Sequence, residues 1–352
     1  MSQSNGKKIL AACGLDAVYV SWEYLMRYVV GFAAENGCVV ADKSGTTLYT
    51  DKRYIEAAKK LLQGTDAQAV LYEQKELLSR LAAYQSVGVS FSALSHVEYL
   101  ALEKAGVKMQ DIDGALEKVM AVKNETELQY ISRACEIAED AFNALLPQIR
   151  EGMTETEVAA LLEYGMRKLG AQGLAFETIV AFGANAAVPH HETGETRLCF
   201  GDEILRDFGC KVNGYCSDIT RTFLFGDDGK HEEFKKAYAC VLKAHELVKE
   251  KLTAGMTCEE GDAIARGHLQ ASGYGELFTH SLGHGIGLNV HEFPYLRPNR
   301  RDILTDGMVF SDEPGVYVEG KYGIRIEDTV TLRNGKVESF MKKTERKLLI
   351  IK

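Results

Sequence analysis

A short segment that occurs twice in this chain does most to limit the folds open to it. EGMTETE at positions 151–157 recurs as AGMTCEE at positions 254–260. Each copy contains T-x-x-E, a pattern in which the threonine and glutamate side chains cap the start of a helix. In both places a long predicted helix precedes the segment, and a second helix and a strand-rich stretch follow it. The repeat therefore predicts two related α/β halves that enclose one site between them.

The region before this repeat has a different pattern, in which short apolar runs alternate with helical periodicity. Strands are predicted at residues 18–20, 37–41, 46–50 and 69–72, and helices at 53–62, 75–84 and 95–105. A long charged helix is predicted at about residues 124–146. We therefore expect an α/β (α+β) protein, with a small α/β domain over residues 1–119 and a larger domain over residues 120–352.

The composition argues against several classes of protein. A net charge of −9 is unsuited to a nucleic-acid-binding surface. The polar N-terminus resembles no signal peptide, and no uninterrupted apolar stretch is long enough to span a membrane. Eight cysteines without a C-x-x-C pair are typical of free thiols in a reducing compartment. We therefore expect a cytoplasmic protein with neither a nucleic-acid nor a membrane partner.

The second domain holds five possible metal ligands, each in a segment that predicts a strand or a strand end. They are Asp207, Asp218, His284, Glu313 and Glu327. Four carboxylates and one imidazole are too acidic a set for a typical structural zinc site. They suit two divalent ions held close together, because cations between crowded carboxylates relieve their repulsion. Two such ions can activate a water and polarise a carbonyl, so the set indicates a hydrolase.

The spacing of these residues predicts how they meet. Asp207 and Asp218 flank Asn213-Gly214, which is a hairpin turn signal. Glu313 and Glu327 flank a glycine-containing connection that predicts a second hairpin. For any one of these acids, capping of a turn or a surface ion pair is the simpler interpretation, but five possible ligands in this order favour a metal site.

These segments resemble the pita-bread metallopeptidases, in the branch that contains Xaa-Pro aminopeptidases and Xaa-Pro dipeptidases. The matching stretches are PHH at 189–191, the run from Asp207 to Thr222, HSLGHGIGLNVHE at 280–292, EPGVY at 313–317 and GIRIED at 323–328. The first domain resembles a shortened creatinase-type N-terminal domain. The resemblance implies a creatinase-like domain followed by a pseudo-duplicated pita-bread catalytic domain. It also implies hydrolysis of the bond before proline from a free N-terminus, with peptides carrying proline at the second position as substrates.

The resemblance also implies a role for each site residue. His284 and Glu313 would hold one ion and Asp207 the other, while Asp218 and Glu327 would bridge the two. Manganese is the expected metal, with cobalt, zinc or iron as alternatives. A homodimer is expected from the resemblance alone.

Further residues match positions around the scissile bond of this family. Glu313 would also help to move the proton of the attacking water. The matches are His190, His280 and His291 (non-ligand histidines), Arg325 (beside the bridging glutamate) and Tyr215 (before the second aspartate). Five histidines match nothing and are predicted to lie at the surface or to pack: His96, His191, His231, His245 and His268.

Two positions depart from the family pattern. Arg206 and Asp312 each precede a ligand at a position that is usually apolar. Neighbouring side chains in a strand point to opposite faces, so both should face away from the metals. We hypothesise an Arg206–Asp312 ion pair behind the site, because an unpaired buried charge is costly. The alternatives are that both are partly solvated, or that each charge meets another residue.

Two questions of function stay open at the level of sequence. A non-catalytic binding or regulatory protein that keeps the fold is the alternative to a peptidase. The sequence also does not separate a dipeptidase from an aminopeptidase acting on longer peptides. A dipeptidase needs a cation to hold the free carboxylate of proline, and Arg297, Arg300 and Arg301 are candidates, although an arginine-rich loop is usually solvated.

Overall fold

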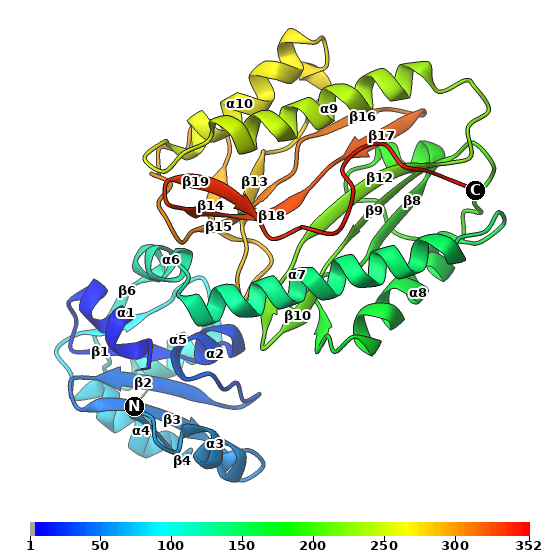
Figure 1. Ribbon diagram of the computed structural model, residues 1–352. Helices are drawn as coiled ribbons and strands as arrows, with labels where there is room; N and C mark the ends of the chain where they lie inside the picture. The colour runs from blue at the N-terminus through cyan, green and yellow to red at the C-terminus, as the bar shows by residue number, and fades with distance from the viewer. Residues whose placement is uncertain (1–3) are drawn as a thin grey trace. The chain divides into compact units, whose positions relative to one another are not determined.

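The computed structural model describes residues 4–352, which form two compact units. One unit ends at Met120 and the other runs from Ala121 to Lys352. Both mix helices and strands (Figure 1), as expected for an α/β chain. Within residues 4–352, no helix has the length and apolar character that a membrane crossing requires.

The first unit is built on one six-stranded sheet with the order β4-β3-β2-β1-β5-β6. Its strands are β1 (Ala17–Val20), β2 (Cys38–Asp42), β3 (Gly45–Thr50), β4 (Ala67–Leu71), β5 (Val87–Val89) and β6 (Met109–Asp111). Its helices are α1 (Gly6–Cys13), α2 (Glu23–Val30), α3 (Ile55–Leu62), α4 (Gln74–Ala82), α5 (His96–Lys104) and α6 (Asp113–Ala121). The predicted strands and helices are confirmed to within two residues, because their apolar periods are regular.

The second unit holds its strands between two pairs of helices (Figure 1). The helices are α7 (Glu125–Leu145), α8 (Glu155–Lys168), α9 (Glu232–Lys251) and α10 (Cys258–Ala271), with short 3-10 turns η1 (Leu146–Gln148), η2 (Gly183–Ala187) and η3 (Gly275–Leu277). In Figure 1, α7 and α8 lie along one side of the strands and α9 and α10 along the other. The long helix predicted at about 124–146 is α7.

Four sheets make up the strand layer of this unit, with the orders β20-β12-β9-β8, β14-β13-β15-β18-β19, β11-β10-β7 and β16-β17. The strands of the first half are β7 (Gly173–Leu174), β8 (Ile179–Phe182), β9 (Glu203–Phe208), β10 (Cys210–Val212), β11 (Tyr215–Cys216) and β12 (Ile219–Phe225). Those of the second half are β13 (Gly283–Gly285), β14 (Glu292–Leu296), β15 (Val309–Asp312), β16 (Gly315–Val318), β17 (Tyr322–Arg325), β18 (Asp328–Arg333), β19 (Lys336–Ser339) and β20 (Ile350–Ile351).

Both hairpins predicted from turn signals are present. β10 and β11 pair antiparallel around Asn213 and Gly214, whose φ angles of 50° and 85° suit the turn that best matches strand twist. β16 and β17 pair antiparallel in the connection between Glu313 and Glu327. The turns therefore fix which strands carry neighbouring ligands.

The internal repeat is confirmed at the two predicted helix starts. Thr154 caps α8 and Thr257 caps α10, and in each case a glutamate three residues later completes the capping box. Both helices have 14 residues. Each threonine also forms an isolated antiparallel bridge, with Arg197 in the first half and Ile303 in the second. The two halves thus begin their second helices in the same local structure.

The buried faces of the two long helices, α7 and α9, also follow the internal repeat. Residues seven apart share a helix face, and each helix buries such a series. The series are Ile131, Ala138 and Leu145 in α7, and Phe234, Val241 and Val248 in α9. Each residue of the second series follows its counterpart by the spacing that separates the two G-M-T segments. α7 and α9 therefore bury positions that are related by the spacing of the repeat.

Candidate metal centre

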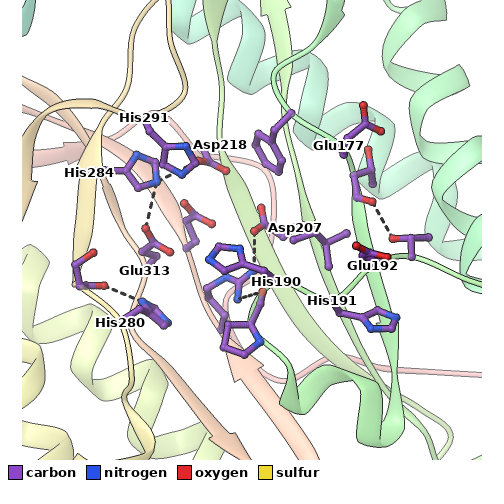
Figure 2. A pocket seen from close by; sticks show the side chains of 18 of the residues that line it. Glu177, His190, His191, Glu192, Asp207, Asp218, His280, His284, His291 and Glu313 are labelled. Atoms are coloured by element: carbon purple, nitrogen blue, oxygen red, sulfur yellow. Dashed lines mark hydrogen bonds and ion pairs between the residues drawn. The ribbon is translucent and has the colours of Figure 1, made fainter. Parts of the chain in front are cut away.

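The strands of the second unit deliver all five predicted ligands to one cavity of about 720 Å³ (Figure 2). Asp207 lies in β9 and Asp218 just before β12, and the antiparallel pairing of these strands brings their carboxylates to one edge. His284 is the middle residue of β13. Glu313 directly follows β15, and Glu327 stands between β17 and β18.

Short distances join the ligands from the two halves. The Nε2 atom of His284 lies 3.3 Å from Oε1 of Glu313 and 3.6 Å from Oδ2 of Asp218. One ligand atom each of Asp218, His284 and Glu327 lie within 4.8 Å of one another. Asp207 accepts a hydrogen bond from Nη2 of Arg325 at 2.6 Å. The cluster therefore draws on residues from five separate places in the chain.

The close packing of β13 explains the glycines around His284. A Cβ atom on Gly283 would lie 1.9 Å from the carbonyl oxygen of Ser311, and one on Gly285 would lie 2.3 Å from that of Phe293. Glycine alone permits this approach of the backbone. The Ser311 hydroxyl lies 3.0 Å from both the His284 backbone nitrogen and Oε1 of Glu313, so it joins two ligands.

The carboxylates carry more negative charge than the protein around them compensates. Burial, together with the neighbouring acids, raises the pKa of Asp218 and of Glu327 well above the ordinary range, and burial raises the pKa of Glu313 to about 8. Within residues 4–352, one buried oxygen of each of Asp207, Asp218 and Glu327 has no hydrogen-bond partner. Unpartnered buried carboxylates are costly, and a divalent cation between them removes that cost. The residues therefore fit a metal site.

The tautomer of His284 supports the same conclusion. Its Nδ1 lies 3.2 Å from the carbonyl oxygen of Gly285, to which it donates, so Nε2 keeps its lone pair. Burial, with His291 nearby, lowers the pKa of His284 to about 3, which keeps the ring neutral. That lone pair faces carboxylate oxygens of Asp218 and Glu313, an arrangement that repels unless a cation lies between them.

The predicted non-ligand residues have different surroundings. His190, His280 and His291 line the cavity, and the His291 ring centroid lies 4.2 Å from that of His284. Arg325 lines it as well and donates to Asp207, to Tyr317 at 2.7 Å and to Thr220 at 3.0 Å. His280 Nε2 lies 2.9 Å from the Tyr317 hydroxyl, so Arg325, Tyr317 and His280 form a chain. The Tyr215 hydroxyl donates to Glu127 of α7 instead.

Two histidines have more specific surroundings than the sequence indicated. His191 lines the cavity, and its Nε2 lies 2.8 Å from Glu155. His245 is buried, with an exposed fraction of 2%, and faces two buried aspartates. Of the other three, His231 lies near Glu203 and Asp228, His268 near Cys240, and His96 starts α5.

The hypothesised Arg206–Asp312 ion pair is wrong. Arg206 is fully buried, with its guanidinium 4.2 Å from the ring centroid of Phe142 and 4.6 Å from that of Phe223. Its three nitrogens have no hydrogen-bond partner in the described part of the chain. Asp312 Oδ2 instead lies 3.0 Å from Nδ1 of His245. The pair fails because Arg206 faces α7 in one half and Asp312 faces α9 in the other.

Several residues that hold the ligands were not predicted from the sequence. Thr220 donates to Glu327 at 2.6 Å, and the Thr329 hydroxyl lies 3.0 Å from the Asp218 backbone nitrogen. Tyr317 joins Arg325 to His280. Thr220 and Thr329 each follow a ligand by two positions. Side chains two apart in a strand share a face, so this spacing could have predicted that both threonines lie beside the ligands.

Comparison with known proteins places this site in a family. Residues 129–334 match the model of metallopeptidase family M24, a stretch that contains every candidate ligand. The chain belongs to metallopeptidase family M24. Residues 5–122 match the creatinase/prolidase N-terminal domain, so both units have relatives within this group. The expected pita-bread fold and peptidase class are thereby confirmed.

Individual M24 relatives match this chain over nearly its whole length. The Xaa-Pro dipeptidase of Pyrococcus furiosus is 35% identical over 349 residues, with 97% of each chain covered. The crystal structure of an X-Pro aminopeptidase from Thermotoga maritima has a TM-score of 0.90 at 35% identity and covers 99% of this chain and 100% of that one. An Xaa-Pro dipeptidase from Bacillus anthracis has a TM-score of 0.93 at 34% identity, with 99% of each chain covered. The chain is therefore a hydrolase of the metallopeptidase class, and its family implies divalent metal ions.

Proposed function

We propose that this M24 enzyme hydrolyses the bond before a proline in the second position of a peptide, using two divalent ions. One observation carries the proposal: four carboxylates and a neutral imidazole meet in a single cavity, with buried oxygens that lack partners among the described residues. Relatives named Xaa-Pro dipeptidase and X-Pro aminopeptidase support the choice of bond. We also propose residues 1–119 and 120–352 as the two domains, and a cytoplasmic homodimer.

We assign one ion to His284 and Glu313 and the other to Asp207, with Asp218 and Glu327 shared between them. The carboxylate-rich set favours manganese, and cobalt, zinc or iron remain alternatives. When bound, the ions supply a water of lowered pKa and polarisation of the scissile carbonyl.

The chain's own residues handle the proton and the developing charge. Glu313 takes the proton of the attacking water, with its carboxylate oriented by the Ser311 hydroxyl. His190 and His291 line the cavity and donate hydrogen bonds to the oxyanion. The leaving proline nitrogen is a secondary amine, so it must receive a proton, which Glu313 returns. Arg325 holds Asp207 and Tyr317 in place.

Purified protein loaded with MnCl₂ tests the proposal. Ala-Pro-Ala should be cleaved to alanine and Pro-Ala, and Ala-Ala-Ala should not. Glu313→Gln should lower kcat by at least about 100-fold, since it removes both a ligand and the proton acceptor. Glu319→Gln makes the same change at an exposed position in the adjoining hairpin and should leave kcat unchanged. Bound manganese without cleavage of any Xaa-Pro peptide would support the binding-protein alternative.

We propose that peptides longer than two residues are the preferred substrates. None of the three candidate arginines lines the cavity: Arg300 pairs with Asp302 and Arg301 with Glu259, while Arg297 lies over the ring of Tyr295, which does line it. Glu177 and Glu192 line the cavity instead, and their charges would repel a free proline carboxylate. Comparing kcat/KM for Ala-Pro and Ala-Pro-Ala tests this. A tenfold or greater preference for the dipeptide would contradict it.

A further inference from the structure

Two buried aspartates lie directly behind the metal ligands. Asp312 precedes Glu313, and Asp328 follows Glu327. The antiparallel pairing of β15 and β18 places Asp312 and Asp328 opposite each other. Because successive side chains in a strand alternate between faces, these aspartates point away from the cavity while the glutamates point into it. A group that holds both aspartates therefore acts on the backbone that carries two ligands.

His245 of α9 contacts both aspartates. Its Nδ1 lies 3.0 Å from Oδ2 of Asp312, and its Nε2 lies 3.6 Å from Oδ2 of Asp328; these are ion-pair contacts, since neither nitrogen has an aligned hydrogen bond among the described residues. Asp328 has further cationic partners, with Arg221 at 2.9 Å and Arg346 at 2.8 Å. Among the ion pairs of residues 4–352, Asp312 pairs with His245 alone. The position of Asp312 thus depends on this histidine.

The internal duplication relates His245 to an aromatic residue of the first half. His245 follows Phe142 by the same spacing as the two buried series of α7 and α9. Each of these residues contacts the residue that precedes a ligand: Phe142 contacts Arg206, and His245 contacts Asp312. Where the first half uses an apolar ring, the second uses a ring with two nitrogens facing carboxylates.

We propose that His245 is a positioning residue for the metal ligands Glu313 and Glu327, acting through Asp312 and Asp328. The proposal rests on the ligand roles assigned above. Without the imidazole, the Asp312 carboxylate would be buried beside Asp328 with no cation of its own, and it would move toward Arg221 and Arg346 or toward water. Either movement displaces the end of β15, and Glu313 with it.

The test compares manganese binding by the metal-free full-length protein and its variants, measured by titration calorimetry. His245→Phe keeps a ring of similar size but leaves Asp312 unpaired. Its dissociation constant for Mn²⁺ should rise by about tenfold or more, the effect expected when a residue that orients a ligand is lost. With the metal saturating, kcat should fall and KM should change by less than twofold. His268→Phe, on the neighbouring helix α10, is the matched control and should bind Mn²⁺ like the wild type.

A second variant separates positioning from general stability. His245→Phe with Asp312→Val removes both partners, so no charge is left unpaired, and Mn²⁺ affinity should return to within about threefold of the wild type. His245→Gln, which keeps a polar side chain, should lie between the two and serves if His245→Phe does not fold. A melting temperature that falls while Mn²⁺ affinity is unchanged would overturn the proposal. So would a double variant as weak as His245→Phe.

The wild type keeps this test distinct from that of the proposed function. Wild-type protein that binds no Mn²⁺ would overturn both. Wild-type protein that binds Mn²⁺ but cleaves no Xaa-Pro peptide would overturn only the function, because the affinity comparison needs no substrate.

Discussion

Arg206 and Asp312 each directly precede a candidate ligand, but the protein accommodates their charges differently. Asp312 meets an imidazole, whereas Arg206 lies between two phenylalanine rings without a hydrogen-bond acceptor in residues 4–352. Burial lowers the pKa of Arg206 to about 9, which reflects the cost of keeping that charge in the core. Two cation–π contacts offset part of this cost.

We expect Arg206→Met to stabilise the protein by about 1–3 kcal/mol, because an apolar side chain of similar length removes an unpaired buried charge. Urea denaturation of the manganese-loaded protein measures the change. Arg333→Met, at a half-exposed position in β18, is the control and should change the free energy of unfolding by no more than about 0.5 kcal/mol. A destabilisation by Arg206→Met would contradict the prediction.

The titration of His245 makes stability depend on pH. Burial lowers its pKa, but Asp312 and Asp328 outweigh burial and raise the pKa to about 9. Since the folded-state pKa lies above the unfolded value near 6.5, the stabilisation is complete below about pH 6.5 and is lost as pH rises through about 9. The charged groups around the imidazole are Asp312, Asp328, Arg221 and Arg346, and Glu139 lies near Arg346. Tyr238 stays neutral because burial raises its pKa.

We therefore expect the difference in unfolding free energy between the wild type and His245→Phe to shrink between pH 7 and 9.5. Urea denaturation at several pH values measures it. A difference that stays constant or grows over this window would show that the imidazole is neutral in the folded protein.

For single residues, the sequence predicted which side chains meet in the cavity. It did not predict which partners the charged neighbours of the ligands contact. The order and spacing of Asp207, Asp218 and Glu313 follow from turns and strand parity, which are local. The Arg206–Asp312 pair failed because it required knowing which helix covers which strand face. The one sequence feature that pointed to His245 is its spacing from Phe142, which equals the spacing of the repeated segments. That spacing is informative only once the repeat is known to extend into the long helices.

The two repeated helices, α8 and α10, begin with the same capping box, but their first residues make different contacts. Glu155, the first residue of α8, is fully buried and accepts hydrogen bonds from the backbone of Phe182 and Gly194 and the side chain of Asn185, and it faces His191. It thereby joins α8 to β8 and to the segment that forms one wall of the cavity. The equivalent residue of α10 is Cys258, which has no carboxylate with which to accept such hydrogen bonds.

We expect Glu155→Ala to destabilise the protein by roughly 2–4 kcal/mol, because one buried and one partly buried backbone N–H group lose their acceptor. KM for Ala-Pro-Ala should rise severalfold, since His190 and His191 lie on the released segment, and kcat should change less. Steady-state kinetics and urea denaturation measure the two effects. Glu195→Ala, an exposed change in the same segment, should alter neither; an unchanged KM in Glu155→Ala would contradict the assigned role.

Most elements could be predicted because their patterns are local. The capping boxes at Thr154 and Thr257 and the turn at Asn213-Gly214 need only a few adjacent residues. The order of strands in the sheets could not be predicted, because it depends on pairings such as β12 with β20 between residues far apart in sequence.

For the molecule as a whole, metal binding and stability are linked through the four carboxylates of the cavity. We expect chelation followed by dialysis to lower the melting temperature, and Mn²⁺ at about 100 times its dissociation constant to add about 2.7 kcal/mol of stability. For a unit of this size that corresponds to roughly 5–10 °C. Scanning calorimetry measures the shift. A variant with Asp218→Asn and Glu327→Gln should show no manganese-dependent shift; an equal shift there would mean that the ion binds elsewhere.

The edge strand β20 has a consequence for how the enzyme matures. It consists of Ile350 and Ile351 and pairs in parallel with β12, the strand that follows Asp218. The sheet that carries the first two ligands is thus completed by a segment that follows the final ligand, Glu327, in the chain. A growing chain therefore cannot complete this edge of the sheet until every ligand has been synthesised, so β20 pairs with β12 only after the whole set of ligands has been made.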